Sequence, residues 1–388
     1  MKFVVLGAGM MGRAVVYDLA RALDVERLVV ADFELKRAQE VARLYGRGKT
    51  RAAFADVRDA AKLARLLRGA TAVVNCTQYN WNLEVMRAAL AARVNYLDLG
   101  GLYHMTRRQF ALDRDFRRIG RIAIAGMGGS PGTTNVMARF LGDSMDRIDS
   151  MDVFNASTDL RHYDSPVAYT FSIATILDEL TMPPIAFQDG RFVERPMLSD
   201  PVVERFPAPI GRVTLRNSIH SELGTLPISF RSKGVREVHF KINYDPQLVG
   251  LVRNLSEVGF ASREAIPVNG TRVAPREVLL SLLNRNAPKV SARDVETIRV
   301  VVRGRMNGRR VTRAAESSAR YTTKPVFSAV ARDTGFPAAI GALMLGRGQF
   351  SGVGVQAPEN VILPEPFFAE LAKRNMPVRH WTVKLGKN

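Results

Sequence analysis

The strongest constraint on the fold is a glycine pattern near the start of the chain. The sequence GAGMMG at residues 7–12 follows a short apolar stretch and precedes a stretch with helical apolar spacing. A G-x-G-x-x-G pattern in that context predicts a strand, a tight turn and a helix. Gly7 permits the turn, Gly9 leaves the backbone open to a pyrophosphate, and Gly12 lets the helix pack on the strand. The pattern therefore predicts a dinucleotide site at the helix N-terminus.

An acidic residue at the end of the second apolar stretch supports this interpretation. Residues 28–31 read LVVA and are followed by Asp32. A carboxylate at this place accepts hydrogen bonds from ribose hydroxyls and repels a 2′-phosphate, which favours NAD over NADP. Lys36 and Arg37 follow closely and keep NADP possible. The alternative role for Asp32 is a helix cap.

Further cofactor candidates follow from their position after strands. Asp56 and Val57 end a predicted strand, where they either contact adenine or cap the next helix. The strand at 72–76 belongs to the buried parallel kind, whose carboxyl ends bind ligands. The predicted cofactor-binding residues are Gly7, Gly9, Met10, Met11, Gly12, Asp32, Asp56, Val57, Asn75, Cys76 and Thr77.

Composition narrows the class of protein. The 388 residues carry a formal net charge of +19, but the basic residues are scattered along the chain, so nucleic-acid binding is not expected. The positive charge is instead expected to attract anionic ligands. One cysteine, Cys76, excludes an intramolecular disulfide and a cysteine-cluster metal site, and no metal is predicted. No stretch is long and apolar enough for a membrane span, and the first strand begins at residue 2, so we expect a cytoplasmic protein without a signal peptide.

The chain changes character near residue 145. Segments 151–157, 236–244 and 297–318 alternate apolar and polar residues, which is typical of antiparallel strands, and the last contains the hairpin turn MNGRR. We predict an α/β protein: a Rossmann dinucleotide-binding domain with an inserted α+β domain built on a mostly antiparallel sheet. The expected divisions are 1–144 for the dinucleotide domain, 145–333 for the substrate and dimerisation domain, and 334–388 for a segment that returns to the first domain.

Several motifs together resemble a known family. VLGAGMMG, VNYLDLGG, AIAGMGGSPGTTNVMA, the helix SIATILDEL and TGFPAAIGALMLGRG occur in the order found in saccharopine dehydrogenase-like reductases, and are most similar to the lysine 6-dehydrogenase branch. The resemblance implies NAD(P), an amino acid or amine substrate with chemistry at a C–N bond, and a homodimer or larger assembly. Saccharopine reductases tend to carry Asp before the Pro-Gly of the third motif. Ser130 stands there in this chain, which argues against saccharopine itself as substrate.

The predicted chemistry is hydride transfer assisted by a proton acceptor. Tyr79 and Asp98 are candidates because they follow strands of the parallel sheet, although Tyr79 could be a pocket wall and Asp98 a buried turn acid. His220 is a candidate from its polar loop, which resembles a substrate-facing loop of the lysine dehydrogenase branch. His104, expected in a loop, is a weaker one. The predicted substrate contacts are Tyr79, Gly100, Thr133, Arg216 and Arg231, the arginines as partners for a carboxylate.

Three functions remain open from the sequence. The first is a lysine 6-dehydrogenase-like oxidative deamination. The second is a reductase that joins an amine to a carbonyl compound, as in saccharopine or carboxynorspermidine formation. The third is a non-enzymatic dinucleotide-binding sensor or scaffold, which the high positive charge keeps open.

Overall fold

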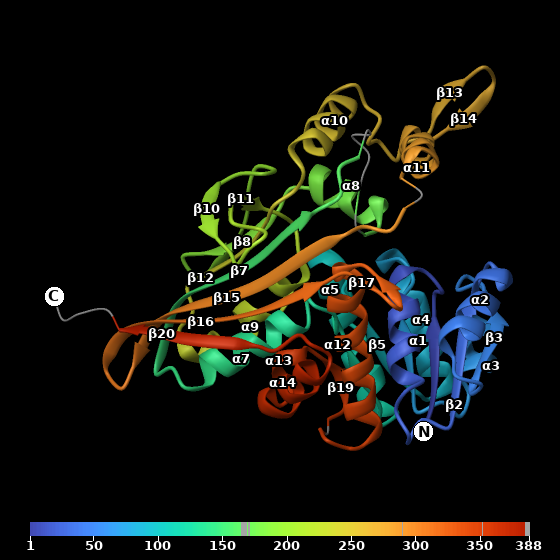
Figure 1. The fold of residues 1–388 in the computed structure, drawn as a ribbon, viewed down its shortest axis with the longest axis horizontal. Helices are drawn as coiled ribbons and strands as arrows, with labels where there is room; N and C mark the ends of the chain where they lie inside the picture. Colours follow the sequence, from blue (N-terminus) through green and yellow to red (C-terminus); the bar gives the residue numbers. More distant parts are fainter. Residues whose placement is uncertain (164–168, 170, 289, 351, 385–388) are drawn as a thin grey trace.

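A parallel sheet forms the first domain of the computed structural model, which describes residues 1–163, 169, 171–288, 290–350 and 352–384 (Figure 1). Neighbouring strands follow the order β19-β6-β5-β4-β1-β2-β3, and all pairs are parallel. The strands are β1 (Lys2–Leu6), β2 (Arg27–Asp32), β3 (Thr50–Phe54), β4 (Ala72–Asn75), β5 (Asn95–Asp98), β6 (Ile122–Ile124) and β19 (Gly354–Gln356). Their carboxyl ends therefore meet at one edge of the sheet.

Helices cover both faces of this sheet. Phe3 and Val5 of β1 pack in the core with α1 (Met10–Leu19) and α12 (Ala329–Gly346), while Val4 and Leu6 face the core with α3 and α4. This alternation is why the strands read as continuous apolar runs. The remaining helices here are α2 (Leu35–Tyr45), α3 (Ala60–Leu67), α4 (Asn82–Ala92), α5 (Leu102–Phe110), α6 (Asp113–Arg118), α13 (Pro358–Val361), α14 (Pro364–Lys373) and the 3₁₀ turn η1 (Tyr79–Trp81).

The second domain is built on a nine-stranded mixed sheet. Its main path runs β10-β11-β12-β7-β15-β16-β20, with β8 and β9 attached to β12. Only the β7–β12 pair is parallel among the described pairs of this sheet. The strands are β7 (Arg147–Asp159), β8 (Ile185–Gln188), β9 (Arg191–Glu194), β10 (Val202–Arg205), β11 (Arg212–Asn217), β12 (Glu237–Ile242), β15 (Asp294–Met306), β16 (Arg309–Arg320) and β20 (Arg379–Lys384). Asn307 and Gly308 turn the β15–β16 hairpin with positive φ, as the MNGRR pattern predicts.

Smaller elements complete the second domain. The helices α8 (Ile173–Thr181), α10 (Pro246–Glu257) and α11 (Pro275–Asn286) share an apolar cluster away from the main sheet. In Figure 1, α10, α11 and the hairpin of β13 (Ile266–Val268) and β14 (Thr271–Val273) project beyond it. The connections include η2 (Ser221–Gly224), α9 (Leu226–Ser229), η3 (Arg231–Lys233) and the ribbon β17 (Thr322–Thr323) and β18 (Val326–Phe327).

The structure differs from the expected domain limits at three places. Helix α7 (Thr133–Asp143) contributes Met137 and Leu141 to the core of the second sheet, and Val136 to the core of the first domain. Helix α12 begins at Ala329 rather than residue 334, since the Asp294 carboxylate accepts hydrogen bonds from its first amides. The C-terminal segment supplies α12 and β19 to the first domain, but β20 pairs with β16 of the second sheet. Residues 385–388 of that segment lie outside the described residues.

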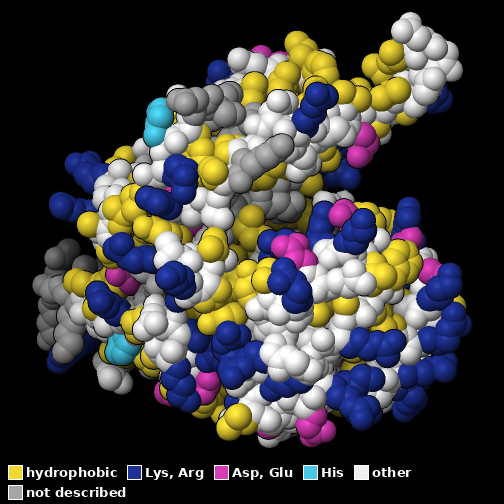
Figure 2. Space-filling model, turned by 45° about the vertical axis from the view of Figure 1, so that its right-hand side comes forward, with side chains coloured by type: hydrophobic (Ala, Val, Ile, Leu, Met, Phe, Trp, Pro, Cys, Tyr) yellow, Lys and Arg dark blue, Asp and Glu magenta, His cyan; other side chains and the backbone are white. Residues whose placement is uncertain are grey.

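The surface carries basic side chains widely, and the two domains leave a hollow between them. On the face in Figure 2, Lys and Arg are spread over both domains rather than gathered into one patch. Among the helices that the structure describes, none has the length and apolar character needed to cross a membrane.

Candidate active site

A cavity of about 1010 Å³ lies between the carboxyl edge of the parallel sheet and the second domain. The first domain contributes the glycine turn after β1 and the segments that follow β2, β3, β4 and β5. The second domain contributes side chains from β7, α8, η2, α11 and β15. The polar and charged residues on its wall include Asp32, Arg37, Asp56, Arg58, Thr77, Tyr79, Ser130, Asn155, Glu179, His220, Arg263, Arg276, Glu296 and Asp333.

The glycine turn has the shape that a diphosphate requires. Gly7 has φ +91°, and a Cβ on it would lie 2.7 Å from the Cys76 carbonyl oxygen; a Cβ on Gly12 would lie 1.9 Å from the Gly7 oxygen. Gly9 lines the cavity and has open space where a Cβ would be. No side chain caps the start of α1, and its first turn holds no acid. The first amides of the helix are therefore free to bind an anion.

Asp32 lies where its carboxylate can meet a ribose. Its Oδ2 accepts a hydrogen bond from the Ala8 amide at 2.7 Å and its Oδ1 one from the Glu34 amide at 2.9 Å. These bonds fix the carboxylate at the cavity wall and leave acceptor capacity on both oxygens. Arg37 also lines the cavity, and its guanidinium pairs with Glu34 at 2.7 Å.

The end of β3 carries an ion pair beside the same part of the cavity. The Arg58 guanidinium and amide donate to the Asp56 carboxylate, and these bonds lower the pKa of Asp56 to about 2. Asp56 is thus ionised and its charge is offset by Arg58. Val57 lines the cavity between them.

The residues after β4 divide between lining and support. Cys76 and Thr77 line the cavity, whereas Asn75 is buried behind them. The Asn75 Oδ1 accepts from Thr77 Oγ1 at 2.7 Å, and its Nδ2 donates to Asn82 Oδ1 at 2.9 Å. Burial raises the pKa of the Cys76 thiol, so this cysteine is a neutral wall residue.

Asp98 does not suit the predicted role of proton acceptor. Its carboxylate is buried and lies outside the cavity wall. It accepts hydrogen bonds from four groups: Tyr96 Oη at 2.8 Å, the Gly100 amide at 2.8 Å, the Gly126 amide at 2.7 Å, and Gln109 Nε2. These bonds join the loops after β5 and β6. We therefore assign Asp98 a structural role that positions Gly100, which does line the cavity.

Tyr79 contacts a charged group that the sequence did not reveal. Its Oη donates to Asp178 Oδ2 at 2.7 Å, and Asp178 Oδ1 pairs with Arg263 at 2.8 Å and with Arg276 at 2.7 Å. Burial and the Asp178 carboxylate raise the pKa of Tyr79, so it is a neutral phenol. Two guanidinium groups therefore surround one carboxylate at this end of the cavity, and Glu277 lines the wall beside them.

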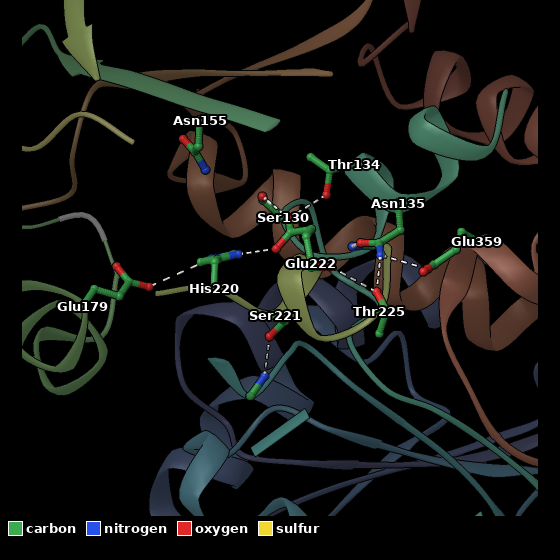
Figure 3. Close-up of polar contacts among 12 residues, drawn as sticks. Ser130, Thr134, Asn135, Asn155, Glu179, His220, Ser221, Glu222, Thr225 and Glu359 are labelled. Atoms are coloured by element: carbon green, nitrogen blue, oxygen red, sulfur yellow. Dashed lines mark hydrogen bonds and ion pairs between the residues drawn. The ribbon is translucent and has the colours of Figure 1, made fainter. Parts of the chain in front are cut away.

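His220 lies between two glutamates, as Figure 3 shows. Its Nδ1 contacts Glu222 Oε2, its Nε2 lies 4.0 Å from Glu179 Oε1, and its ring stacks on Phe240 with 3.8 Å between centroids. Burial alone would lower the pKa of His220, but the charges of Glu222 and Glu179 outweigh it and raise that pKa. Burial raises the pKa of Glu179 to about 7. We call Glu179, His220 and Glu222 the His220 cluster.

Glu222 connects the His220 cluster to the loop at the start of α7. Its Oε1 accepts from Ser130 Oγ at 2.6 Å and from Thr134 Oγ1 at 2.8 Å (Figure 3). Burial would raise the pKa of Glu222, yet the His220 charge and these hydrogen bonds lower it. Glu222 is therefore an ionised, fully partnered carboxylate.

Other predicted contacts lie elsewhere. Thr133 is buried and donates to the Gly128 carbonyl at 3.2 Å, outside the cavity wall. Arg216 is exposed on β11 and donates to the Leu198 carbonyl at 3.2 Å, and Arg231 is exposed in η3. Neither arginine lines the cavity, so Arg263 and Arg276 replace them as the candidate partners of a substrate carboxylate. His104 lies in α5, not in a loop, with its side chain exposed.

The geometry defines a class: a two-domain, dinucleotide-dependent protein with its site between the domains. Residues 3–124 match the family model of the saccharopine dehydrogenase NADP binding domain, and residues 128–376 match that of the saccharopine dehydrogenase C-terminal domain. The chain belongs to the saccharopine dehydrogenase family of NAD(P)-dependent oxidoreductases. The predicted family, fold class and nicotinamide dinucleotide cofactor are confirmed.

Individual relatives are distant but extend over most of the chain. It is 24% identical over 389 residues to carboxyaminopropylagmatine dehydrogenase of Synechocystis sp., covering 97% of this chain and 96% of the relative. It is 25% identical over 306 residues to carboxynorspermidine synthase of Vibrio cholerae, and the match covers 74% of this chain and 71% of the relative. The fold is similar to that of saccharopine dehydrogenase (L-Glu forming) from Saccharomyces cerevisiae, with a TM-score of 0.75, 17% identity and coverage of 98% and 99%. It is also similar to homospermidine synthase from Legionella pneumophila in complex with NAD, with a TM-score of 0.71, 13% identity and coverage of 99% and 91%.

Proposed function

We propose that this protein makes or breaks the C–N bond that joins an amine to a carboxylate-bearing carbon, using NAD(P). The observation that carries the proposal is the charge pattern of the cavity wall around the second domain and α12. Arg263 and Arg276 place guanidinium donors in one part, and such donors suit a substrate carboxylate. Glu179, Glu296 and Asp333 line other parts and suit a cationic amine, although the protein as a whole is strongly basic. The two curated relatives are named for carboxylated amines, which agrees with this substrate class.

The residues of the first domain fit the cofactor. Gly9 and the free amides of α1 would hold the diphosphate, and Asp32 would accept from the ribose hydroxyls. Cys76, Thr77 and Gly100 would border the nicotinamide end. When bound, NAD(P) supplies or accepts the hydride.

The His220 cluster supports the proton transfers that such a reaction needs. An amine must lose a proton before it attacks a carbonyl carbon, and the carbonyl oxygen must gain protons to leave as water. A carboxyl with a pKa near neutrality can accept and return a proton at working pH, and Glu179 is such a group. Both glutamates raise the pKa of His220 and so favour its protonated form beside Glu179, and Glu222 fixes the orientation of the imidazole. We propose Glu179 as the proton acceptor, with His220 as the neighbouring cation that favours its ionised form, and Tyr79 as a positioning residue held by Asp178.

A lysine 6-dehydrogenase-like deamination is the second candidate. The D-L-G-G turn and Ser130 before Pro131-Gly132 favour that branch. The same site would then oxidise one amino acid and need no carbonyl partner. Assembly as a homodimer and a cytoplasmic location stay predictions under either candidate.

The test is a paired turnover assay. Purified protein is supplied with NADH or NADPH and combinations of amines with keto acids or aldehydes, and separately with NAD or NADP and single amino acids, lysine first. Cofactor oxidation that requires both an amine and a carbonyl compound supports the proposal. Cofactor reduction with lysine alone selects the deamination. Binding of the cofactor without turnover in either assay contradicts both and favours the sensor or scaffold hypothesis.

The role of Glu179 has its own control. We expect Glu179→Gln to lower kcat by about a hundredfold or more and to remove the pH dependence near neutrality. The exposed Glu365 on α14 provides the matched substitution, Glu365→Gln, which should leave turnover unchanged. An unchanged pH profile in Glu179→Gln would reject Glu179 as the proton acceptor.

A further inference from the structure

Two buried acids outside the His220 cluster line the cavity and have few partners. Glu296 comes from β15 and Asp333 from α12, and their exposed fractions are 6% and 3%. Glu296 Oε1 accepts a hydrogen bond from Asn155 Nδ2 at 2.9 Å. Glu296 Oε2 is buried and has no hydrogen-bond partner among the residues that the structure describes. Within residues 1–163, 169, 171–288, 290–350 and 352–384, no side chain donates a hydrogen bond to the Asp333 carboxylate.

The loop that precedes α7 makes room for Asp333. A Cβ on Gly129 would lie 2.2 Å from Asp333 Oδ2, so only glycine fits there. The neighbouring Arg332 compensates Asp333 only through its charge, which lowers the pKa of Asp333, because its guanidinium donates its hydrogen bonds to the Arg320 and Arg374 carbonyls at 2.6 and 2.7 Å. The backbone thus accommodates a carboxylate at the cavity wall, and none of the described residues forms a direct ion pair with it.

The two carboxyls lie close enough to affect each other. Burial raises the pKa of both, and the Asp333 charge raises that of Glu296 further, while Asp294 adds to it from the start of β15. An unpartnered carboxylate in a buried place is costly. The protein retains Glu296, with one unpartnered oxygen, and Asp333 in contact with a cavity large enough for an extended ligand.

We propose that Glu296 and Asp333, together with Asn155, form an ammonium subsite that holds a second cationic nitrogen of the amine substrate. The substrate amine is then a diamine or polyamine. An ammonium group offers three donors, which matches an unpartnered Glu296 oxygen and the Asp333 carboxylate. It also supplies a direct ionic partner, which neither acid has among the described residues. This inference rests on the proposed function, since it names the class of the amine.

Binding measurements test the subsite without turnover. Calorimetry with NADH or NADPH present, and no carbonyl compound, compares 1,4-diaminobutane with butylamine, which has the same carbon chain and one ammonium group fewer. We expect the diamine to bind at least about tenfold more tightly. Because the acids release protons when a cation binds, the heat of diamine binding should depend on the ionisation enthalpy of the buffer near pH 7.

The variants Asp333→Asn and Glu296→Gln should each bring the affinity ratio close to one and abolish the proton release. Both substitutions keep side-chain size and remove a buried charge, so neither should lower the midpoint of thermal unfolding. Glu365→Gln should retain the ratio. Equal affinity for the two amines in the natural protein, or a preference that survives both substitutions, would overturn the subsite.

The outcomes separate this inference from the proposed reaction. A diamine preference that depends on Glu296 and Asp333, without any turnover of amine and carbonyl pairs, keeps the subsite and rejects the reaction. Turnover with an affinity ratio of one rejects the subsite and keeps the reaction.

Discussion

Glu222 and Glu296 are both buried glutamates of the second domain, yet their surroundings differ. Glu222 accepts hydrogen bonds from Ser130 and Thr134 and contacts the His220 ring, and these donors lower its pKa. Glu296 accepts from Asn155 alone among the described residues, and burial beside Asp333 raises its pKa. Burial by itself therefore does not decide the state of a carboxyl group. Donors make Glu222 part of the framework, and their absence leaves Glu296 able to bind a cation.

The largest effect on stability should come from removing the Glu222 carboxylate. Glu222→Ala would leave Ser130, Thr134 and His220 without their common acceptor in a buried place. We expect the free energy of unfolding to fall by about 3–5 kcal/mol, as for other broken buried ion pairs. Urea unfolding at pH 7 measures this loss.

The isosteric variant Glu222→Gln is the control for that loss. It keeps an acceptor for Ser130 and Thr134 but removes the charge beside His220, so its loss should be smaller. A loss below about 1 kcal/mol in Glu222→Ala would mean that the hydrogen bonds of Glu222 do not hold the domains in place.

The first-domain wall of the cavity was predictable from the sequence, because its residues lie in contiguous motifs. The residues from Gly7 to Asp32 form a strand, turn, helix and strand in succession, so local spacing fixes which of them face the ligand. The alternation in the second half of the chain likewise indicated a largely antiparallel sheet. Asp98 was ambiguous because a residue at the end of a strand can face either the cavity or the loops behind it.

The opposite wall was not predictable because its residues meet only in the folded chain. Arg216 was predicted as a partner for a substrate carboxylate, but strand alternation on β11 directs it to solvent. Arg276 had a signal that was missed. It shares the buried face of α11 with Leu279 and Leu283, and a buried arginine on an apolar helical face needs a carboxylate partner.

Neutralising Asp333, which forms no ion pair with the described residues, should raise the free energy of unfolding, whereas removing Glu222 should lower it. The pKa of Asp333 is about 7 in the folded protein against an ordinary value of 3.8. Between these values the folded state binds more protons than the unfolded state, so the contribution of Asp333 to stability falls as pH rises from 4 to 7. Asp333→Asn should therefore be more stable than the natural protein at pH 8, by about 2 kcal/mol, and should show little gain at pH 4.

Urea unfolding at several pH values checks this sign. Arg332 and Glu296 are the charged neighbours of Asp333, so Glu296→Gln should show a gain in the same direction. Destabilisation of Asp333→Asn at pH 8 would show that Asp333 has a cationic partner in the free protein, and the contrast with Glu222 would fail.

The smallest expected effect is on cofactor preference, which depends on Asp32 in the first-domain wall of the cavity. Asp32→Asn keeps an acceptor for the Ala8 amide but removes the charge that repels a 2′-phosphate. Arg37 and Arg58 line the same part of the cavity and can then approach a phosphate. We expect the ratio of the dissociation constants for NADPH and NADH to shift towards NADPH by about tenfold, or about 1.4 kcal/mol.

Asp56→Asn is the matched control, because the Asp56 charge is already offset by Arg58. If both variants shifted the ratio equally, general charge near the cavity would set the preference rather than the fixed carboxylate of Asp32. A specific effect at Asp32 would show that one charge in a short motif determines cofactor choice, whereas amine choice on the opposite wall needs acids from two distant elements.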